Sequence, residues 1–434
     1  MIGIIGGGIS GLSLAYFLQK ANIPYQLFEA SNKVGGLINT TKSDNYILET
    51  GPNSILCAEE IIELLHEWGL KDDIIYPNYA SKFRFVVKNG KLQKLPSGPL
   101  SLLFGNYFSS NAKINLLKEY FNKSTTDGSE SVASFFNRRF GSEITDYAVN
   151  PFVTGIYAGD PSRLLVNQTF PQLVAYEKDF GSVIKGVIKN KSGKRKQSLN
   201  FKNGMEQLPI AIASHLEHLM LDTTVRQVVP SANGFKLNTS KGEFEVQKLV
   251  ICTPSYIASK LLVNIDPDAA TAFDRIEYAV TTAVYSSYNQ ADVTIKPEGF
   301  GALNPAKESR FSAGTIWTSS IMPYRTNENE ILFTTFVGGT GAEEKAMLPD
   351  EEILEKVHQD LKEIYQISNK PVFTYIKRWS QAIPQYTRIA LESYKLIPKL
   401  ERRGVYINAN WKDGVSLSDR ILNSRELAKI IDKI

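Results

Sequence analysis

The residues with the clearest chemical signature are glycines that follow the first apolar segment of the chain. Gly6, Gly8 and Gly11 have the spacing GxGxxG. Between a strand and a helix, such glycines permit a tight turn, let the backbone approach a pyrophosphate and allow the helix to pack on the strand. Ile9 and Ser10 would then offer N–H groups of the helix N-terminus to the phosphates. This stretch predicts a dinucleotide site.

A carboxylate follows where a ribose site requires one. Glu29 ends the predicted strand 25–29, about 20 residues after the glycines, and an acid there favours ribose hydroxyls over the 2′-phosphate of NADP. Gly35 and Gly36 follow five residues later and extend the close backbone approach along a longer cofactor. This arrangement resembles the FAD-binding start of the amine oxidase-like flavoproteins. The resemblance adds Ala30 and Leu37 to the cofactor-binding residues.

No residue set for nucleophilic or metal chemistry is visible. The four histidines are scattered, and His215 and His218, three residues apart, have no further ligands nearby, so we expect no metal site. Cys57 and Cys252 lie in apolar sequence and are expected to be reduced, buried thiols. The chemistry is therefore expected to come from the flavin, while the protein supplies position and electrostatics.

Composition bounds the class of protein. The chain has 434 residues, 43% of them hydrophobic, and a net charge of +4. This length predicts two or three domains, and the small charge excess gives no reason to expect a nucleic acid partner. No signal peptide precedes the first strand and no apolar run could span a bilayer, so we expect a cytoplasmic protein.

The order of the patterns predicts an α/β (α+β) fold: a Rossmann-like FAD-binding domain with a sheet-based substrate domain and a helical insertion. We expect the FAD-binding domain over 1–80, 200–266 and 376–434. The substrate domain should cover 81–95 and 267–375, and the helical domain 96–199. Basic residues interspersed with Gly, Ser and Asn predict a flexible loop over 185–202.

Two interpretations of the helical domain stay open. Residues 99–108 and 114–121 are apolar and aromatic, with lysines in the second segment. They are either ordinary core helices or a surface that makes peripheral contact with membrane lipid, which would place the protein on the cytoplasmic face of the cell membrane. A homodimer is also left open.

Further stretches resemble the protoporphyrinogen oxidases, in order and along essentially the whole chain. They are 48–54, 150–161, 299–305, 335–339, 379–386 and 410–416. The resemblance implies that Arg84 binds a substrate propionate and that Asn53 lies near the reacting carbon and the flavin, as the two catalytic residues. Read locally, Arg84 is an exposed strand charge, the less favoured alternative, and Asn53 is as readily a turn residue after Pro52.

The remaining roles also come from the resemblance. Leu303, Ile316 and Phe336 would sandwich the macrocycle, and the carbonyl of Gly155 would approach it. The other residues expected beside FAD are Gly51, Pro52, Asn53, Val225, Trp379, Asn410, Gly414, Val415 and Ser416. Two positions depart from the family pattern: Leu37, where an arginine is common, and Ala409, where a glycine is usual. No cysteine lies near residues 410–416, here called the C-terminal flavin segment, so we expect FAD to be bound non-covalently.

The resemblance implies an oxygen-dependent oxidase of haem biosynthesis that converts protoporphyrinogen IX to protoporphyrin IX. Hydride would leave a methylene bridge for the flavin, and molecular oxygen would be the final acceptor. The alternative within the superfamily is a coproporphyrinogen III oxidase. A polyamine or carotenoid oxidoreductase would give no reason for Arg84, and a non-catalytic flavin- or porphyrin-binding protein would bind FAD without being reduced by a porphyrinogen.

Overall fold

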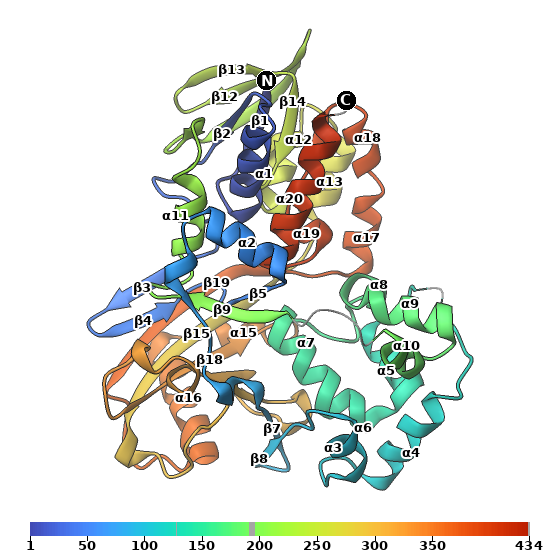
Figure 1. Cartoon of the computed structure of the whole chain (residues 1–434), viewed down its shortest axis with the longest axis vertical. Coiled ribbons are helices and arrows are strands. Elements are labelled where there is room, and N and C mark those ends of the chain that lie inside the picture. The colour runs from blue at the N-terminus through green and yellow to red at the C-terminus, as the bar shows by residue number, and fades with distance from the viewer. Residues whose placement is uncertain (127, 191–195, 433–434) are drawn as a thin grey trace.

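The computed structural model describes residues 1–126, 128–190 and 196–432. Three units are visible in Figure 1: an α/β unit at the top that holds both termini, a large sheet at the lower left and a helical unit at the lower right. Each unit has its own apolar core, because residues far apart in sequence bury their side chains together.

A five-stranded parallel sheet forms the centre of the α/β unit. Its strand order is β10-β2-β1-β14-β20, and all four neighbouring pairs are parallel. Both faces are covered, as a parallel sheet requires, so β1 is apolar throughout and β14 is apolar after Lys248. The strands are β1 (Ile2–Ile5), β2 (Tyr25–Phe28), β10 (Leu219–Met220), β14 (Lys248–Ile251) and β20 (Val405–Ile407).

Helices and a small sheet cover this parallel sheet. The first and last long helices, α1 and α20, lie side by side in both ribbon views. The helices are α1 (Ile9–Lys20), α2 (Glu59–Glu67), α11 (Gln207–Ala213), α12 (Ser255–Leu262), α13 (Pro267–Asp274), α17 (Arg388–Tyr394), α18 (Ile397–Glu401), α19 (Asn410–Asp413) and α20 (Leu417–Asp432). An antiparallel sheet adds β11 (Val225–Ser231), β12 (Gly234–Thr239) and β13 (Gly242–Val246).

A seven-stranded mixed sheet forms the second unit. Its strands, in spatial order, are β19 (Phe373–Pro384), β15 (Tyr278–Asn289), β18 (Glu330–Gly338), β17 (Gly314–Trp317), β16 (Gly301–Leu303), β7 (Arg84–Lys88) and β8 (Lys91–Lys94). The amphipathic helix α16 (Asp350–Tyr365) covers one face, where Trp317 and Phe333 are buried against it. The short helices are α14 (Thr318–Ile321) and α15 (Glu343–Ala346).

Two small sheets join the units. The hairpin of β3 (Thr40–Ser43) and β4 (Tyr46–Glu49) leaves the α/β unit and packs on the large sheet. In the other, β9 (Gln197–Phe201) lies between β5 (Ile55–Cys57) and β6 (Ile74–Ile75). The 3₁₀ turns are η1 (Lys71–Asp73), η2 (Tyr79–Lys82), η4 (Gln290–Asp292), η5 (Ala306–Glu308) and η6 (Pro323–Arg325).

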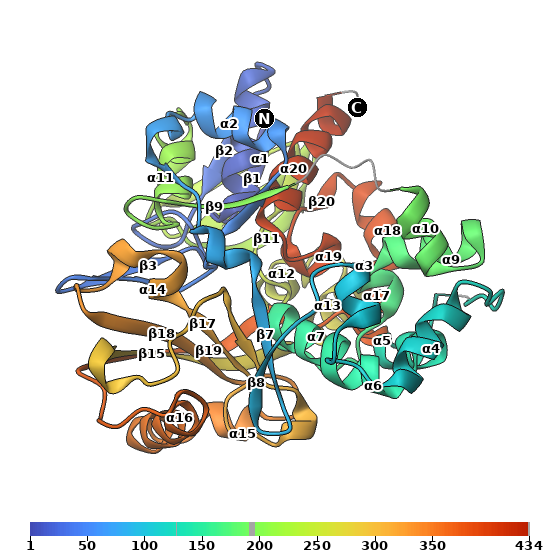
Figure 2. The ribbon, with the colours of Figure 1, turned by 60° about the horizontal axis from the view of Figure 1, so that its bottom comes forward.

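The third unit is a helical insertion between β8 and β9. It comprises α3 (Pro99–Phe104), α4 (Ser110–Glu119), α5 (Val132–Phe140), α6 (Ser142–Ile144), the π-helix η3 (Thr145–Val149), α7 (Asn150–Tyr157), α8 (Val166–Thr169), α9 (Pro171–Phe180) and α10 (Val183–Lys189). Figure 2 shows α7 beside β7 and β8, at the border with the large sheet.

The predicted fold class is confirmed, but the predicted loop over 185–202 is wrong over most of its described length. Helix α10 extends to Lys189 because the Ser182 side chain caps it, and β9 begins at Gln197 because β5 and β6 pair with it. Residues 191–195 lie outside the described residues. The predicted domain boundary at 376 falls within β19, and the division into domains stays a prediction.

Candidate active site

The turn between β1 and α1 contains two glycines, Gly6 and Gly11, whose backbone shape or packing requires glycine. Gly6 has φ +111°, and a Cβ at Gly11 would lie 1.9 Å from the Gly6 carbonyl oxygen. By contrast, a Cβ at Gly8 would meet no atom within 4 Å. The first turn of α1, which includes Ile9 and Ser10, has no side-chain cap at Gly8. Among the described residues, the N–H groups of Ile9 and Ser10 have no hydrogen-bond acceptor, so they are available to an anion beside the glycine turn.

The second glycine pair packs directly on the first turn. The Gly35 N–H donates to the Gly7 carbonyl at 2.9 Å, and Gly35 forms a parallel bridge with Gly8. Gly36 has φ +58°, and a Cβ there would lie 3.3 Å from the Gly8 Cα. The two motifs thus form one continuous strip of backbone. Leu37 follows on the strip and is exposed.

Glu29 lies at the end of β2, beside this strip. One of its carboxylate oxygens accepts the Gly7 N–H at 2.6 Å, and the other accepts the backbone and side chain of Ser31 at 2.8 Å. Ala30 is exposed next to it. The chain that leads to β11 runs alongside, since the Thr223 N–H donates to the Glu29 carbonyl. Val225, predicted to contact adenine, begins β11 two residues later.

The segment of residues 50–54, here called the Asn53 loop, lies against the strip. A Cβ at Gly51 would lie 2.2 Å from the Leu37 carbonyl oxygen, so only glycine permits this approach. Pro52 and Asn53 are half-buried. The Asn53 carbonyl accepts the Asn200 side chain at 2.7 Å. Across the described ranges 1–126, 128–190 and 196–432, the Asn53 amide side chain makes no hydrogen bond, so it is available to a ligand.

The C-terminal flavin segment closes the same region. Asn410 opens α19, Gly414 ends it with φ +97°, and Val415 and Ser416 lead into α20. Ala409 is extended at φ −139°, so the alanine there causes no backbone strain. Sequence reasoning missed the buried Arg420, which donates to the carbonyls of Ala409 and Asp413 at 2.9 and 2.7 Å and holds the segment in place. Nothing in the local sequence distinguishes a buried arginine one turn into a helix from an exposed one.

The predicted substrate residues share one face of the large sheet, here called the floor. Leu303, Gly314 and Phe336 are direct neighbours on three adjacent strands. Gly301 and Ile316 form the next row, and directly paired residues point to the same face. Leu303, Ile316 and Phe336 are half-buried, whereas α16 buries the opposite face. The floor is therefore apolar and open.

Glycines allow close packing at the floor. A Cβ at Gly314 would lie 3.0 Å from the Leu303 side chain, and one at Gly301 would lie 2.3 Å from the Thr315 carbonyl oxygen. A Cβ at Gly155 of α7 would also lie 2.9 Å from Leu303, so this helix approaches the floor at its glycine. The structure thus brings together Gly155 and Leu303, two of the residues predicted to contact the substrate.

Arg84 lies at the edge of the floor. It pairs with Gly301 in the parallel register of β7 and β16, and its guanidinium lies 5.0 Å from the Phe300 ring centre. The side chain is exposed, yet the atoms around the guanidinium desolvate it enough to lower its pKa. No ion pair of Arg84 is found in the part of the chain that the structure describes. A partly desolvated cation without a carboxylate partner suits an anionic ligand.

Three further residues near the site escape sequence reasoning. Phe152 and Ile156, one turn apart on the helix that carries Gly155, are exposed by 45% and 40%. Lys377 lies on the floor face, since it and Phe336 both pair with Ala283, and its ammonium lies 4.8 Å from the Trp379 ring centre. The i, i+2 spacing of Lys377 and Trp379 is the one feature of the local sequence that could have pointed to Lys377.

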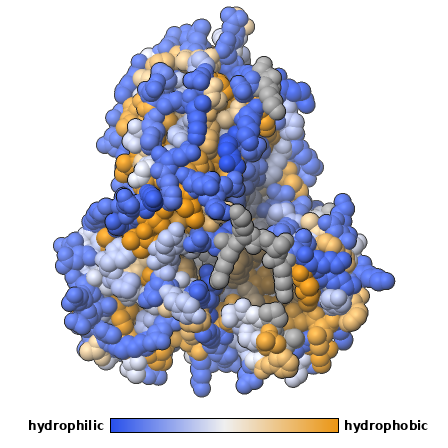
Figure 3. All heavy atoms as spheres, viewed as in Figure 1, coloured by the Kyte–Doolittle hydropathy of each residue, from blue (hydrophilic) through white to orange (hydrophobic). Residues whose placement is uncertain are grey.

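The surface agrees with this geometry. It is hollowed below the α/β unit, and hydrophobic residues line the visible part of the hollow (Figure 3).

Among the described residues, no group of three or more His, Cys, Asp or Glu could hold a metal ion. His215 and His218 instead pack edge-on against Tyr16 and Tyr25.

The strip of glycine backbone fits a flavin dinucleotide. Gly6, Gly11, Gly35 and Gly51 are closed in by other backbone atoms, whereas Gly8 faces open space where a pyrophosphate would approach. Glu29 lies at one end of the strip, and the Asn53 loop and the C-terminal segment lie towards the floor. The strip can therefore hold the adenosine of the dinucleotide at its Glu29 end and the flavin ring at the end nearer the floor.

Comparisons with known proteins agree. The family of flavin containing amine oxidoreductases matches residues 9–408. A chloroplastic protoporphyrinogen oxidase of Oryza sativa subsp. japonica is 31% identical over 99% of this chain and 87% of its own. Coproporphyrinogen III oxidase of Staphylococcus aureus (strain NCTC 8325 / PS 47) is 28% identical over 89% and 88%. A crystal structure from Exiguobacterium sp. 255-15, described provisionally as a protoporphyrinogen oxidase, has a TM-score of 0.84 at 22% identity, over 99% and 98%.

The match begins in the first turn of α1 and ends just after β20, so it includes all three units. The glycine strip and the floor lie within it. The chain belongs to the family of flavin-containing amine oxidoreductases, and it is an oxidoreductase with FAD as its cofactor.

Proposed function

We propose that this protein oxidises a porphyrinogen, with protoporphyrinogen IX as the substrate and molecular oxygen as the acceptor. The observation that carries the proposal is Arg84, a cation at the edge of an apolar floor that has no carboxylate partner among the described residues. A porphyrinogen combines the two features that such a site recognises, an apolar macrocycle and carboxylate side chains. The protoporphyrinogen oxidase of Oryza sativa subsp. japonica and its relatives support the same substrate class.

In this function the chain binds and orients. Arg84 holds a propionate with paired N–H donors, while Leu303, Ile316 and Phe336 contact the apolar macrocycle. FAD, held by the glycine strip and the Asn53 loop, would supply the acceptor for the hydride from the substrate carbon. The Asn53 amide, which makes no hydrogen bond within the described residues, donates to or accepts from polar groups near that carbon.

Coproporphyrinogen III is the second candidate substrate. The Staphylococcus aureus relative favours it, and so does Lys377, a second cation on the floor face that could take another propionate. The half-buried apolar side chains of the floor favour the substrate with fewer propionates, because each unpaired carboxylate on an apolar surface costs desolvation energy.

The test is anaerobic reduction of the flavin. Purified yellow protein is mixed with protoporphyrinogen IX or coproporphyrinogen III, and flavin bleaching and porphyrin fluorescence are followed. We expect faster bleaching with protoporphyrinogen IX. Faster bleaching with coproporphyrinogen III would reassign the substrate, and no bleaching with either by FAD-loaded protein would reject the proposed function. Readmission of oxygen should restore the yellow colour.

We also propose that the helical insertion makes peripheral contact with lipid. Leu100, Phe104 and Phe121 are exposed by 73%, 80% and 76% on α3 and at the end of α4. Lys185 of α10 lies over the Tyr120 ring, so a basic helix adjoins these side chains. Exposed aromatic residues beside lysines suit the interface of an anionic membrane.

None of the described helices is both long and apolar enough to cross a bilayer. A cytoplasmic location and a homodimer stay predictions.

Vesicle sedimentation tests this contact. We expect the protein to bind vesicles that contain anionic lipid, and the double variant Phe104→Ser/Phe121→Ser to bind at least tenfold more weakly, because each buried aromatic side chain contributes about 2 kcal/mol. Val263→Ser, at a residue exposed by 53% in the α/β unit, is the control and should bind normally. Equal binding by all three proteins would contradict the contact.

A further inference from the structure

A buried polar cluster lies directly behind the Asn53 loop. Its centre is the carboxylate of Glu49, the last residue of β4, with 3% of the residue exposed. This carboxylate accepts the Thr40 hydroxyl at 2.8 Å, the Asn200 side chain at 2.9 Å and the Met205 N–H at 3.0 Å. Arg325 of η6, 1% exposed, lies 2.6 Å from it as an ion pair. The cluster therefore joins the hairpin, the large sheet and β9.

Asn200 links this cluster to Asn53, one of the two predicted catalytic residues. Its side-chain nitrogen donates both to the Glu49 carboxylate and to the Asn53 carbonyl, at 2.9 and 2.7 Å, and its oxygen accepts the Phe201 N–H at 2.6 Å. Asn200 is fully buried. All its hydrogen-bonding groups are therefore engaged, and its orientation is fixed from both sides.

We propose that Asn200 is a positioning residue for FAD and for the reaction. It holds the backbone of the Asn53 loop against the glycine strip, and the Glu49–Arg325 ion pair holds Asn200. The loop has few other constraints: Thr50 bonds the Thr41 hydroxyl at 3.1 Å, and Gly51 lies on the Leu37 carbonyl. Without Asn200, the Asn53 carbonyl is freed and Asn53 no longer has a fixed place beside the flavin. The inference rests on the FAD site of the proposed function.

The same geometry explains why β9 matters to the site. β9 pairs with β5, the strand that follows the Asn53 loop, through Ile55 and Leu199. Backbone pairing fixes the end of the loop, and the Asn200 side chain fixes its middle. Because β9 is also the strand that returns from the helical insertion, the loop is held by three units at once.

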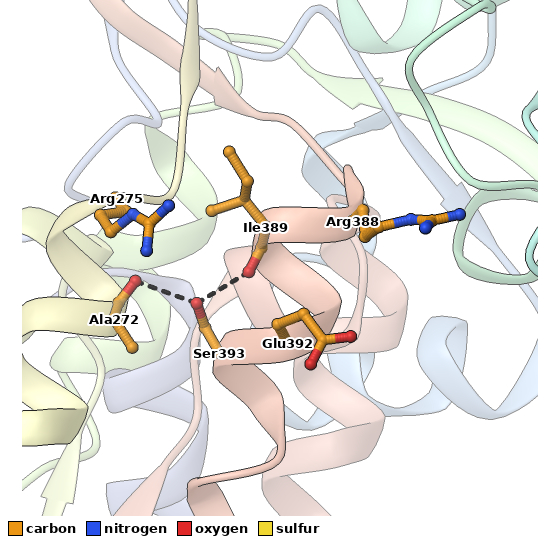
Figure 4. A pocket seen from close by; sticks show the side chains of 6 residues that line it. All are labelled: Ala272, Arg275, Arg388, Ile389, Glu392 and Ser393. Carbon is orange, nitrogen blue, oxygen red and sulfur yellow. Dashed lines mark hydrogen bonds between the residues drawn. The ribbon is translucent and has the colours of Figure 1, made fainter.

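The experiment compares Asn200→Ala with a matched control. Ser393→Ala also removes a buried hydrogen-bonding side chain, which donates to the Ala272 and Ile389 carbonyls at 2.9 Å in a surface pocket between α13 and α17 (Figure 4). That pocket contains none of the predicted site residues. We expect Asn200→Ala to weaken FAD binding about tenfold and to lower kcat at least tenfold, with little change in KM. We expect Ser393→Ala to leave FAD binding, kcat and KM unchanged.

Hydrogen exchange of residues 50–54 in the holoenzyme is the second readout. We expect these amides to exchange at least tenfold faster in Asn200→Ala than in Ser393→Ala, with unchanged exchange in the five-stranded sheet. If Asn200→Ala does not fold, Asn200→Ser replaces it, because serine keeps a donor but cannot reach both acceptors. Equal FAD affinity and equal loop exchange in the two variants would overturn the inference. Failure of wild-type apoprotein to bind FAD would instead reject the proposed function.

Discussion

Arg84→Ala should raise KM for the porphyrinogen about 100-fold and change kcat much less. Hydrogen bonds to a charged group contribute about 1.5–3 kcal/mol, and every 1.4 kcal/mol is about a factor of ten. Arg84 lies at the edge of the floor and not among its apolar side chains, so it should bind ground state and transition state alike. Steady-state kinetics of oxygen consumption measures both constants.

Two comparisons make this prediction specific. Arg84→Lys should recover part of the affinity, because the ammonium keeps the charge but loses the planar fork of donors. Lys91→Ala removes an exposed cation from the same hairpin and should leave both constants unchanged. With the porphyrinogen dimethyl ester, which has no propionate charge, wild type and Arg84→Ala should be alike. A tenfold loss on the ester as well would show that Arg84 does not bind the carboxylate.

Arg325→Met should lower the free energy of unfolding by about 3–5 kcal/mol. Removing one partner of a buried ion pair leaves the other charge unpaired, and the Glu49 side chain is only 1% exposed. The three remaining donors to the Glu49 carboxylate are neutral, so they do not replace the lost charge. The midpoint of urea unfolding, followed by tryptophan fluorescence, measures the change.

The double variant Glu49→Gln/Arg325→Met decides the cause. If the unpaired charge accounts for the loss, a neutral glutamine should recover more than half of it. Lys20→Met serves as the control, since it breaks an exposed pair with Glu67 and should cost less than about 1 kcal/mol. Equal loss in the single and double variants would mean that packing of the arginine side chain, and not its charge, stabilises this region.

Local sequence decides the dinucleotide strip almost completely. Backbone carbonyls within five residues in the sequence constrain Gly11 and Gly35, and the positive φ of the turn constrains Gly6, so spacing carries the signal. Among these backbone contacts, only that of Gly6 with Cys252 comes from a distant segment. The carboxylate of Glu29 is found the same way, because a fixed number of residues separates it from the glycines. The apolar strands and the amphipathic helix α16 also follow from periodicity alone.

The floor could be proposed only through a family resemblance. Arg84, Leu303, Ile316 and Phe336 come from four strands, and nothing in their own neighbourhoods distinguishes them from ordinary strand residues. Strand register places them on one face, and a shift by one residue would turn each side chain to the α16 face. Register is set by pairing between distant segments and is therefore a tertiary property.

Asn200 marks the limit of sequence reasoning for this protein. Its segment is basic and polar, which predicts a loop, yet pairing with β5 and β6 makes it a strand and buries the asparagine. By itself the sequence determined where FAD phosphates would bind, because that site depends on backbone shape within one turn. Only the tertiary structure decided what holds the Asn53 loop and which side chains form the floor, because those contacts join segments up to 276 residues apart, from Glu49 to Arg325.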